Sequence, residues 1–190
     1  MKDKNDMETY VSILRGINVS GQKKVNMKEL KALYEELGFT QVRTYIQSGN
    51  VVFESSPAKP QDLAKQIEEK IADKYKFDVP IIIRDAEEWE NTRKANPFLA
   101  KDNSQLDKLH VTFLSEEPTQ AHLDKVATYR YEPDEFIIVG KDVYVYCPNG
   151  YGNTKLNNTF FENKLKVTAT TRNWKTVNEL ANLIKNTPYN

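Results

Sequence analysis

The order of the predicted strands and helices constrains this chain most, because the same order occurs twice within its 190 residues. Segments in which apolar and polar residues alternate predict strands, and apolar residues spaced three or four apart predict helices. Both halves give the order βαββαβ, although they share almost no identical residues. This order is typical of a ferredoxin-like unit, whose helices cover one face of a mainly antiparallel sheet. The predicted fold class is therefore α+β, with two ferredoxin-like βαββαβ units in tandem.

In the first half, the helix expected after the first strand has recognisable ends. Asn26 stands where an N-cap is needed, Glu29 follows three residues later, and Gly38 comes directly after the last apolar residue of the pattern. The predicted strands are 10–17, 42–47, 51–54 and 80–84, and the predicted helices are 27–37 and 63–72. A turn at 48–50 (Ser-Gly-Asn) joins the second and third strands.

In the second half, the sequence predicts the same elements followed by one more helix. The predicted strands are 110–114, 136–139, 143–147 and 167–171, and the predicted helices are 123–127, 160–165 and 177–184. Thr176 and Glu179 form a capping box before the last helix. We therefore expect a first unit at 8–84, a polar connector at 85–108, and a second unit with its C-terminal helix at 109–190.

Composition excludes several classes of protein. The chain has 27 basic and 27 acidic residues, so it does not hold nucleic acid or a membrane by bulk charge. Its 39% hydrophobic content excludes intrinsic disorder. The single cysteine, Cys147, allows no intramolecular disulfide, and no signal peptide or membrane-spanning segment is visible. The expected location is therefore the cytoplasm.

A basic, glycine-containing loop after the first strand is the most informative segment. Between residues 15 and 31 there are five basic residues and one acidic residue. In a ferredoxin-like sheet, this loop, the 48–50 turn and the start of the first helix lie at the same end. Glycines permit close backbone approach, and exposed N–H groups at a helix start favour anions. The sequence thus predicts a phosphate or anion site, against the alternative that these residues only shape loops.

A second basic segment, residues 164–175, has four basic residues and no acidic one, and it also leads into a helix. Trp174 there is more typical of core packing than of ligand stacking. If the two basic segments meet, the second supplies another wall of the site. The predicted ligand-binding residues are Arg15, Asn18, Lys23, Lys24, Ser48, Asn50, Arg172, Asn173 and Trp174.

Other chemistry finds little support in the sequence. Residues 16–23 resemble a phosphate-binding P-loop, but Gln22 interrupts the motif and no magnesium-binding hydroxyl follows. With two histidines and one cysteine, no metal-ligand spacing is present, and no cofactor is expected. Cys147 alternates with apolar residues, which indicates a buried thiol. No catalytic residue can be assigned, and whether the chain is an enzyme stays open.

Nucleic-acid binding is the alternative function. The strand at 143–147 places Tyr144 and Tyr146 on one face, as in RNA-binding domains of the same fold, where aromatic rings stack on bases. The alternative is that these rings seal the contact between the two units. The nucleic-acid hypothesis would make single-stranded RNA or DNA a partner. A membrane is not expected as a partner, and the oligomeric state stays open.

The strings LRGIN, TYIQSGNVVF and TRNWKTV occur here in this order, beginning at residues 14, 44 and 171. With ANPF at 95–98, they resemble domain-of-unknown-function family 1697, whose members are mostly bacterial. The resemblance extends over nearly the whole chain. It implies two ferredoxin-like α+β subunits and no particular activity. The strings fall on both basic segments and on the 48–50 turn.

Overall fold

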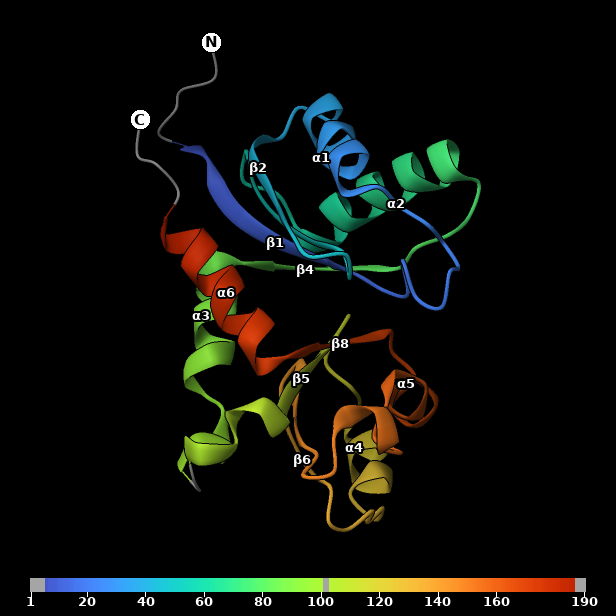
Figure 1. Cartoon of the computed structure of the whole chain (residues 1–190), viewed down its shortest axis with the longest axis vertical. Coiled ribbons are helices and arrows are strands. Elements are labelled where there is room, and N and C mark those ends of the chain that lie inside the picture. Colours follow the sequence, from blue (N-terminus) through green and yellow to red (C-terminus); the bar gives the residue numbers. More distant parts are fainter. Residues whose placement is uncertain (1–5, 101–102, 187–190) are drawn as a thin grey trace. The chain divides into compact units, whose positions relative to one another are not determined.

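The computed structural model of the protein describes residues 6–100 and 103–186, which form two compact units (Figure 1). The first unit contains the residues up to Asn91 together with those from Glu179 onward, and the second unit is Thr92–Asn178. Both boundaries fall inside a helix: one lies between residues 91 and 92, and the other between residues 178 and 179.

The first unit is built on a four-stranded sheet with the strand order β2-β3-β1-β4, in which all neighbours are antiparallel. Its elements are β1 (Glu8–Leu14), α1 (Met27–Glu36), β2 (Thr40–Tyr45), β3 (Asn50–Ser55), α2 (Pro60–Tyr75), β4 (Ile81–Asp85) and α3 (Ala86–Lys94). The core between the sheet and its helices contains a cluster of packed rings from Tyr10, Tyr34, Phe39 and Phe53. This is the ferredoxin-like arrangement predicted for the first half.

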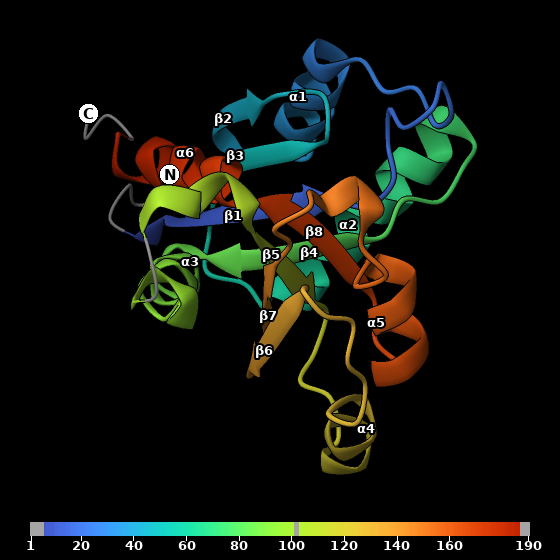
Figure 2. The same ribbon diagram turned by 60° about the horizontal axis from the view of Figure 1, so that its bottom comes forward.

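The second unit repeats the topology with the strand order β6-β7-β5-β8, again antiparallel throughout. Its elements are β5 (Leu109–Leu114), α4 (Gln120–Val126), β6 (Glu135–Val139), β7 (Asp142–Tyr146), α5 (Asn158–Leu165), β8 (Ala169–Asn173) and the start of α6 (Trp174–Lys185), with 3-10 helices η2 (Pro97–Ala100), η3 (Asn103–Lys108) and η4 (Tyr151–Asn153). The part of α6 from Glu179 onward belongs to the first unit. Figure 2 shows β6 beside β7 at one edge of this sheet. The predicted fold class is confirmed.

The predicted ends of α1 are confirmed. The Asn26 side-chain oxygen accepts hydrogen bonds from the N–H groups of Lys28 (2.9 Å) and Glu29 (3.3 Å). At the other end, Gly38 has φ +85°, and its N–H donates to the Glu35 carbonyl at 3.0 Å. Phe39 N–H donates to the Tyr34 carbonyl at 3.3 Å, which completes a Schellman motif. The helix therefore ends where the glycine predicts.

The register of the two sheets shows that the two units also place the same type of residue at an equivalent position. Arg84 on β4 lies opposite Val11 on β1, and Arg172 on β8 lies opposite Val111 on β5. Both arginines are almost completely buried. Each unit thus places a buried arginine at the same position of its fourth strand.

A capped helix follows this arginine in both units. The Asp85 side chain accepts from the Glu88 N–H at 2.7 Å, and the Asn173 side chain accepts from the Thr176 N–H at 2.8 Å. The prediction that Thr176 caps the last helix is therefore wrong: α6 begins at Trp174, and Thr176 lies in its first turn. The segment 85–108, predicted as a connector, contains α3 as the counterpart of α6.

The central strands are buried on both faces. In β1, Tyr10 and Leu14 belong to the core on the helix side, whereas Val11 and Ile13 point the other way, and all four are at most 1% exposed. Accessible polar groups therefore gather at the ends and edges of the sheets. Across the described residues, no helix combines the length and the apolar character needed to span a membrane.

Candidate functional site

Three separate segments meet at one end of the first unit, as the topology predicts. The N–H of Leu14, at the end of β1, donates to the Gly49 carbonyl in the β2–β3 turn at 2.9 Å. Asn18 Nδ2 donates to the carbonyl of Gln47 in the same turn (2.8 Å) and to that of Val25, just before α1 (3.0 Å). Asn18 Oδ1 accepts from the Val25 N–H at 2.9 Å. One side chain therefore joins the loop to the turn and to the start of the helix.

The close approach of the turn to β1 depends on a glycine. Gly49 has φ +84°, and a Cβ added there would lie 2.7 Å from Ile17 Cδ1 and 2.8 Å from Leu14 Cβ. Any other L-residue would strain the backbone and collide with two core side chains. The Ser-Gly-Asn turn predicted at 48–50 is thus required by packing.

The loop that carries the basic residues has an unusual backbone. Asn18, Ser20 and Lys23 all have positive φ, at 55°, 50° and 44°. Such conformations cost of order 1 kcal/mol or more for a non-glycine residue. The loop's own hydrogen bonds hold them, since Asn18 N–H donates to the Lys23 carbonyl (3.1 Å) and Gln22 N–H to the Val19 carbonyl (2.9 Å). The loop is therefore a fixed structure.

Several backbone amides that an anion would need are already bonded within the protein. The N–H groups of Asn18, Gln22 and Val25 donate to acceptors in the loop. At the helix start, Asn26 takes the N–H groups of Lys28 and Glu29. The expectation of a cradle of exposed N–H groups is wrong for these five positions, because two of them donate to backbone carbonyls and three to the side chains of Asn18 and Asn26.

Two of the predicted hydrogen-bonding residues shape the turn. Asn50 is fully buried, and its Nδ2 donates to the Tyr45 carbonyl (2.9 Å) and to Ser48 Oγ (3.0 Å). These bonds close the β2–β3 turn from inside. Asn50 therefore shapes the turn from inside, and Ser48, which is half-buried, is bonded to it.

The basic side chains of the loop differ in how they are held. Lys23 Nζ donates to the Asp78 carbonyl at 2.6 Å and lies 6.0 Å from the centre of the Phe77 ring. Lys24 is exposed, and Arg15 is half-buried. The structure thus brings Arg15, Lys23 and Lys24 to one end of the first unit, with Lys23 fastening the loop.

The second basic segment lies in the second unit, and its three predicted ligand-binding residues are bonded or buried within the protein. Arg172 is 8% exposed, and its Nη1 donates to Thr170 Oγ1 (3.1 Å) and to the Thr171 carbonyl (2.9 Å). Burial lowers the pKa of Arg172 to about 10. Asn173 caps α6, and Trp174 is 5% exposed, which agrees with the packing role expected for it.

The two tyrosines of the nucleic-acid hypothesis do share a face, but that face is covered. Tyr144 is 1% exposed, and its hydroxyl donates to the Thr92 carbonyl at 2.7 Å. The Tyr146 ring lies 6.0 Å from that of Phe98, and its hydroxyl donates to the Gln105 side chain. A buried ring cannot stack on a base, so Tyr144 offers no stacking surface in this structure.

Potentially reactive groups sit inside the second unit. Cys147 is buried as predicted, and burial raises the pKa of its thiol to about 11. His110 is stacked on Tyr151 at 4.7 Å between ring centres, and burial lowers its pKa. Within the described part of the chain, no three His, Cys, Asp or Glu side chains are grouped to hold a metal ion.

Sequence reasoning missed a hollow of about 950 Å³ in the second unit, beside α4 and β6. None of the predicted site residues lines it. The available signal was the strand at 136–139, which is apolar at every position although it stands at the edge of its sheet. An edge strand with two apolar faces leaves apolar surface exposed.

Comparisons with known proteins agree with the fold. The model of the family described as "Protein of unknown function (DUF1697)" matches residues 7–144. No curated protein matches the chain. Among solved structures, the conserved bacterial protein SP0830 from Streptococcus pneumoniae is 24% identical, with a TM-score of 0.71 over 94% of this chain and 99% of that one. At this identity, the likeness supports the fold alone.

Proposed function

We propose that this chain, which belongs to the DUF1697 family of proteins of unknown function, binds a phosphate-bearing ligand through the basic loop of its first unit. The observation that carries the proposal is the fixed loop itself. It carries Arg15, Lys23 and Lys24 on a backbone with positive φ at Asn18, Ser20 and Lys23, and the Asn18 side chain ties it to Val25 and Gln47 by three hydrogen bonds. No acidic residue occurs between positions 15 and 28. Strain of this kind, when the surrounding structure enforces it, is concentrated at functional sites.

The loop binds the ligand mainly with side chains. Several backbone amides are bonded internally, so the charge on the ligand meets Lys24 and Lys28, which are exposed, and Arg15 at the base of the loop. Lys23 stays on the Asp78 carbonyl and fixes the loop. Contacts between exposed charges are screened by salt, so the affinity falls as ionic strength rises. A ligand with several phosphates engages more of these cations than a single phosphate does.

Titration of the full chain with inorganic tripolyphosphate tests this proposal. Each exposed charge contact contributes about 0.2–1 kcal/mol, so the double variant Lys24→Gln and Lys28→Gln should bind roughly fivefold more weakly. The matched control is Lys59→Gln, at the N-cap of α2, with Lys65→Gln on that helix, which removes the same charge from exposed positions elsewhere in the unit. Equal affinity for both double variants would overturn the proposal.

A second arm distinguishes two sources of phosphate. Oligothymidylate of ten nucleotides is titrated under the same conditions, because a nucleic-acid backbone presents the same chemistry as a polyphosphate. Tighter, salt-sensitive binding of the oligonucleotide, lost in the Lys24 and Lys28 variant, would assign the loop to nucleic acid. Preference for tripolyphosphate would assign it to a small ligand.

A further inference from the structure

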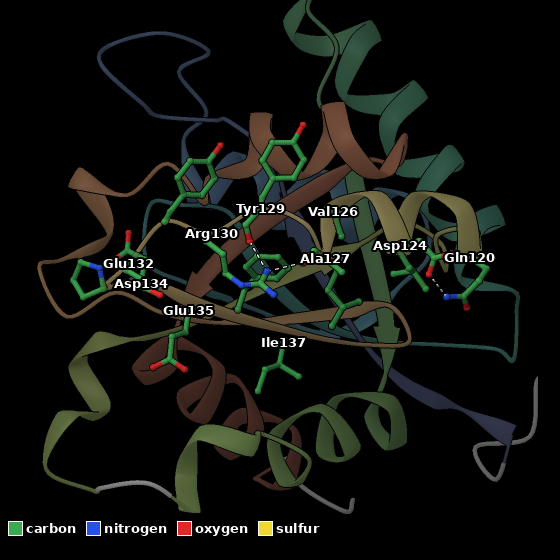
Figure 3. A pocket seen from close by; sticks show the side chains of 15 residues that line it. Gln120, Asp124, Val126, Ala127, Tyr129, Arg130, Glu132, Asp134, Glu135 and Ile137 are labelled. Atoms are coloured by element: carbon green, nitrogen blue, oxygen red, sulfur yellow. Dashed lines mark hydrogen bonds between the residues drawn. The ribbon is translucent and has the colours of Figure 1, made fainter.

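The hollow of the second unit is a groove that runs between α4 and the edge strand β6. Its apolar wall contains Leu123 and Val126 from α4 and Phe136 and Ile138 from β6. Figure 3 shows Arg130 in the middle of the groove, Glu132, Asp134 and Glu135 toward one end, and Asp124 with Gln120 toward the other. At about 950 Å³ it is large enough for several residues of an extended peptide.

The comparison of the two units explains why the groove exists. In the first unit, α1 has ten residues and packs against the edge strand β2. In the second unit, α4 has seven residues and packs chiefly against α5. The space that the helix fills beside the edge strand of the first unit is therefore open beside β6. Phe136 and Ile138 are only half-buried as a result.

The backbone of β6 offers hydrogen bonds along this groove. Gly140 and Lys141 form a two-residue turn, so the pair Val139 and Asp142 that closes it is hydrogen-bonded across the ladder. Bonding alternates along an antiparallel strand, and Ile137 is therefore bonded to β7 as well. The N–H and C=O groups of Phe136 and Ile138 point to the other side, which is the free edge of the sheet. An added strand would use these groups.

The charged residues that line the groove indicate which kind of peptide it binds. Four carboxylate side chains line it, those of Asp124, Glu132, Asp134 and Glu135, in a chain whose net charge is zero. The one basic lining residue, Arg130, donates from Nη1 to the carbonyls of Ala127 (2.5 Å) and Tyr129 (2.8 Å) and so caps α4. The outer side of the strand adds Ile137 and Val139, which are 38% and 48% exposed.

We propose that this groove binds an extended polypeptide segment, which adds to β6 as a further strand and carries lysine or arginine next to its apolar residues. The apolar side chains of the segment cover Phe136 and Ile138, and its cations meet Glu132 at the acidic end of the groove. A second copy of the chain fits less well, because pairing through β6 would bring two acidic rims together.

The probe is the acetylated and amidated peptide Lys-Thr-Val-Arg-Val-Thr-Lys, and its counterpart has glutamate at the three basic positions. Both are titrated into the isotopically labelled full chain, and amide hydrogen exchange is followed residue by residue. Strand addition should slow exchange of the Phe136 and Ile138 amides at least tenfold. The amides of Ile137 and Val139, already bonded to β7, should change little. Binding of the peptide anywhere else would leave this alternation absent.

The variants separate charge from fold. Glu132→Lys should weaken binding of the cationic peptide severalfold, whereas Glu116→Lys, an equal charge change at an exposed position outside the groove, should not. The proposal is overturned if the glutamate peptide binds equally well or if the alternating protection is missing. Protection of Phe136 and Ile138 that rises with protein concentration in the absence of peptide would also overturn it, in favour of a second copy.

Discussion

Both amide atoms of the Asn18 side chain bond the backbone of Val25: Nδ2 donates to its carbonyl oxygen over 3.0 Å, and Oδ1 accepts from its N–H over 2.9 Å. The two residues flank positions 19–24, which include Lys23 and Lys24, so this pair of bonds closes that part of the loop at its base. A third bond, to Gln47, ties the closed loop to the β2–β3 turn. One side chain therefore ties both ends of this segment to each other and to the turn.

Replacing Asn18 should loosen the loop and weaken its affinity for phosphate together. Asn18→Ala removes three hydrogen bonds and places alanine at a φ of 55°, so we expect the free energy of unfolding to fall by about 2 kcal/mol. Asn18→Gly loses the same bonds, but glycine accepts the backbone conformation, so the free energy of unfolding should fall by only about 1 kcal/mol. Urea unfolding measures the first effect and tripolyphosphate titration the second. Unchanged affinity in both variants would mean that the clamp has no part in binding.

Gly49 provides a test of packing at the same end of the unit. Gly49→Ala should lower the free energy of unfolding by about 3 kcal/mol, because the new Cβ would lie 2.7 Å from Ile17 in addition to the strain at positive φ. Gly16→Ala is the matched control: it also has positive φ, at +74°, but nothing lies within 4 Å of its Cβ position. The free energy of unfolding of Gly16→Ala should fall by only about 1 kcal/mol. Equal losses in urea unfolding would show that the contact with β1 has no cost.

The elements of the fold could be predicted because local signals agreed with the topology. The α1 ends show this: Asn26 and Gly38 act within a few residues of their positions, and nothing distant competes with them. The cap of α6 could not be fixed in the same way. Asn and Thr are both residue types that cap helices, and which of Asn173 and Thr176 caps α6 depends on how far β8 continues, which its pairing with β5 determines.

The meeting of the loop, the turn and the helix start was predictable, but the hydrogen-bond partners of their atoms were not. Topology alone brings the loop, the turn and the helix start together. The partners of the Asn18 amide lie 7 and 29 residues away, and no local pattern assigns an acceptor at that distance. The groove beside β6 depends on the length of α4 and on which neighbour it packs against, neither of which apolar spacing determines.

The stability of the chain should decline with acid through His110. Burial lowers the pKa of His110 in the folded state below its ordinary value of 6.5, so the unfolded chain takes up this proton more readily. The stabilisation from the neutral ring is thus complete above about pH 6.5 and is lost as the pH falls below it. Urea unfolding between pH 5 and 8 should show this loss in the parent chain and a flatter profile in His110→Gln. Identical pH profiles would show that His110 does not contribute.

The assignment of the α6 N-cap to Asn173 leads to a prediction about stability. Asn173→Ala leaves the Thr176 N–H without its acceptor, and should lower the free energy of unfolding by about 1 kcal/mol. Asn173→Asp keeps the acceptor and adds a negative charge at the helix start, as Asp85 does before α3, so its stability should equal or exceed that of the parent. Urea unfolding of the three proteins measures the order. If Asp were as destabilising as Ala, the cap would have to be assigned to another residue.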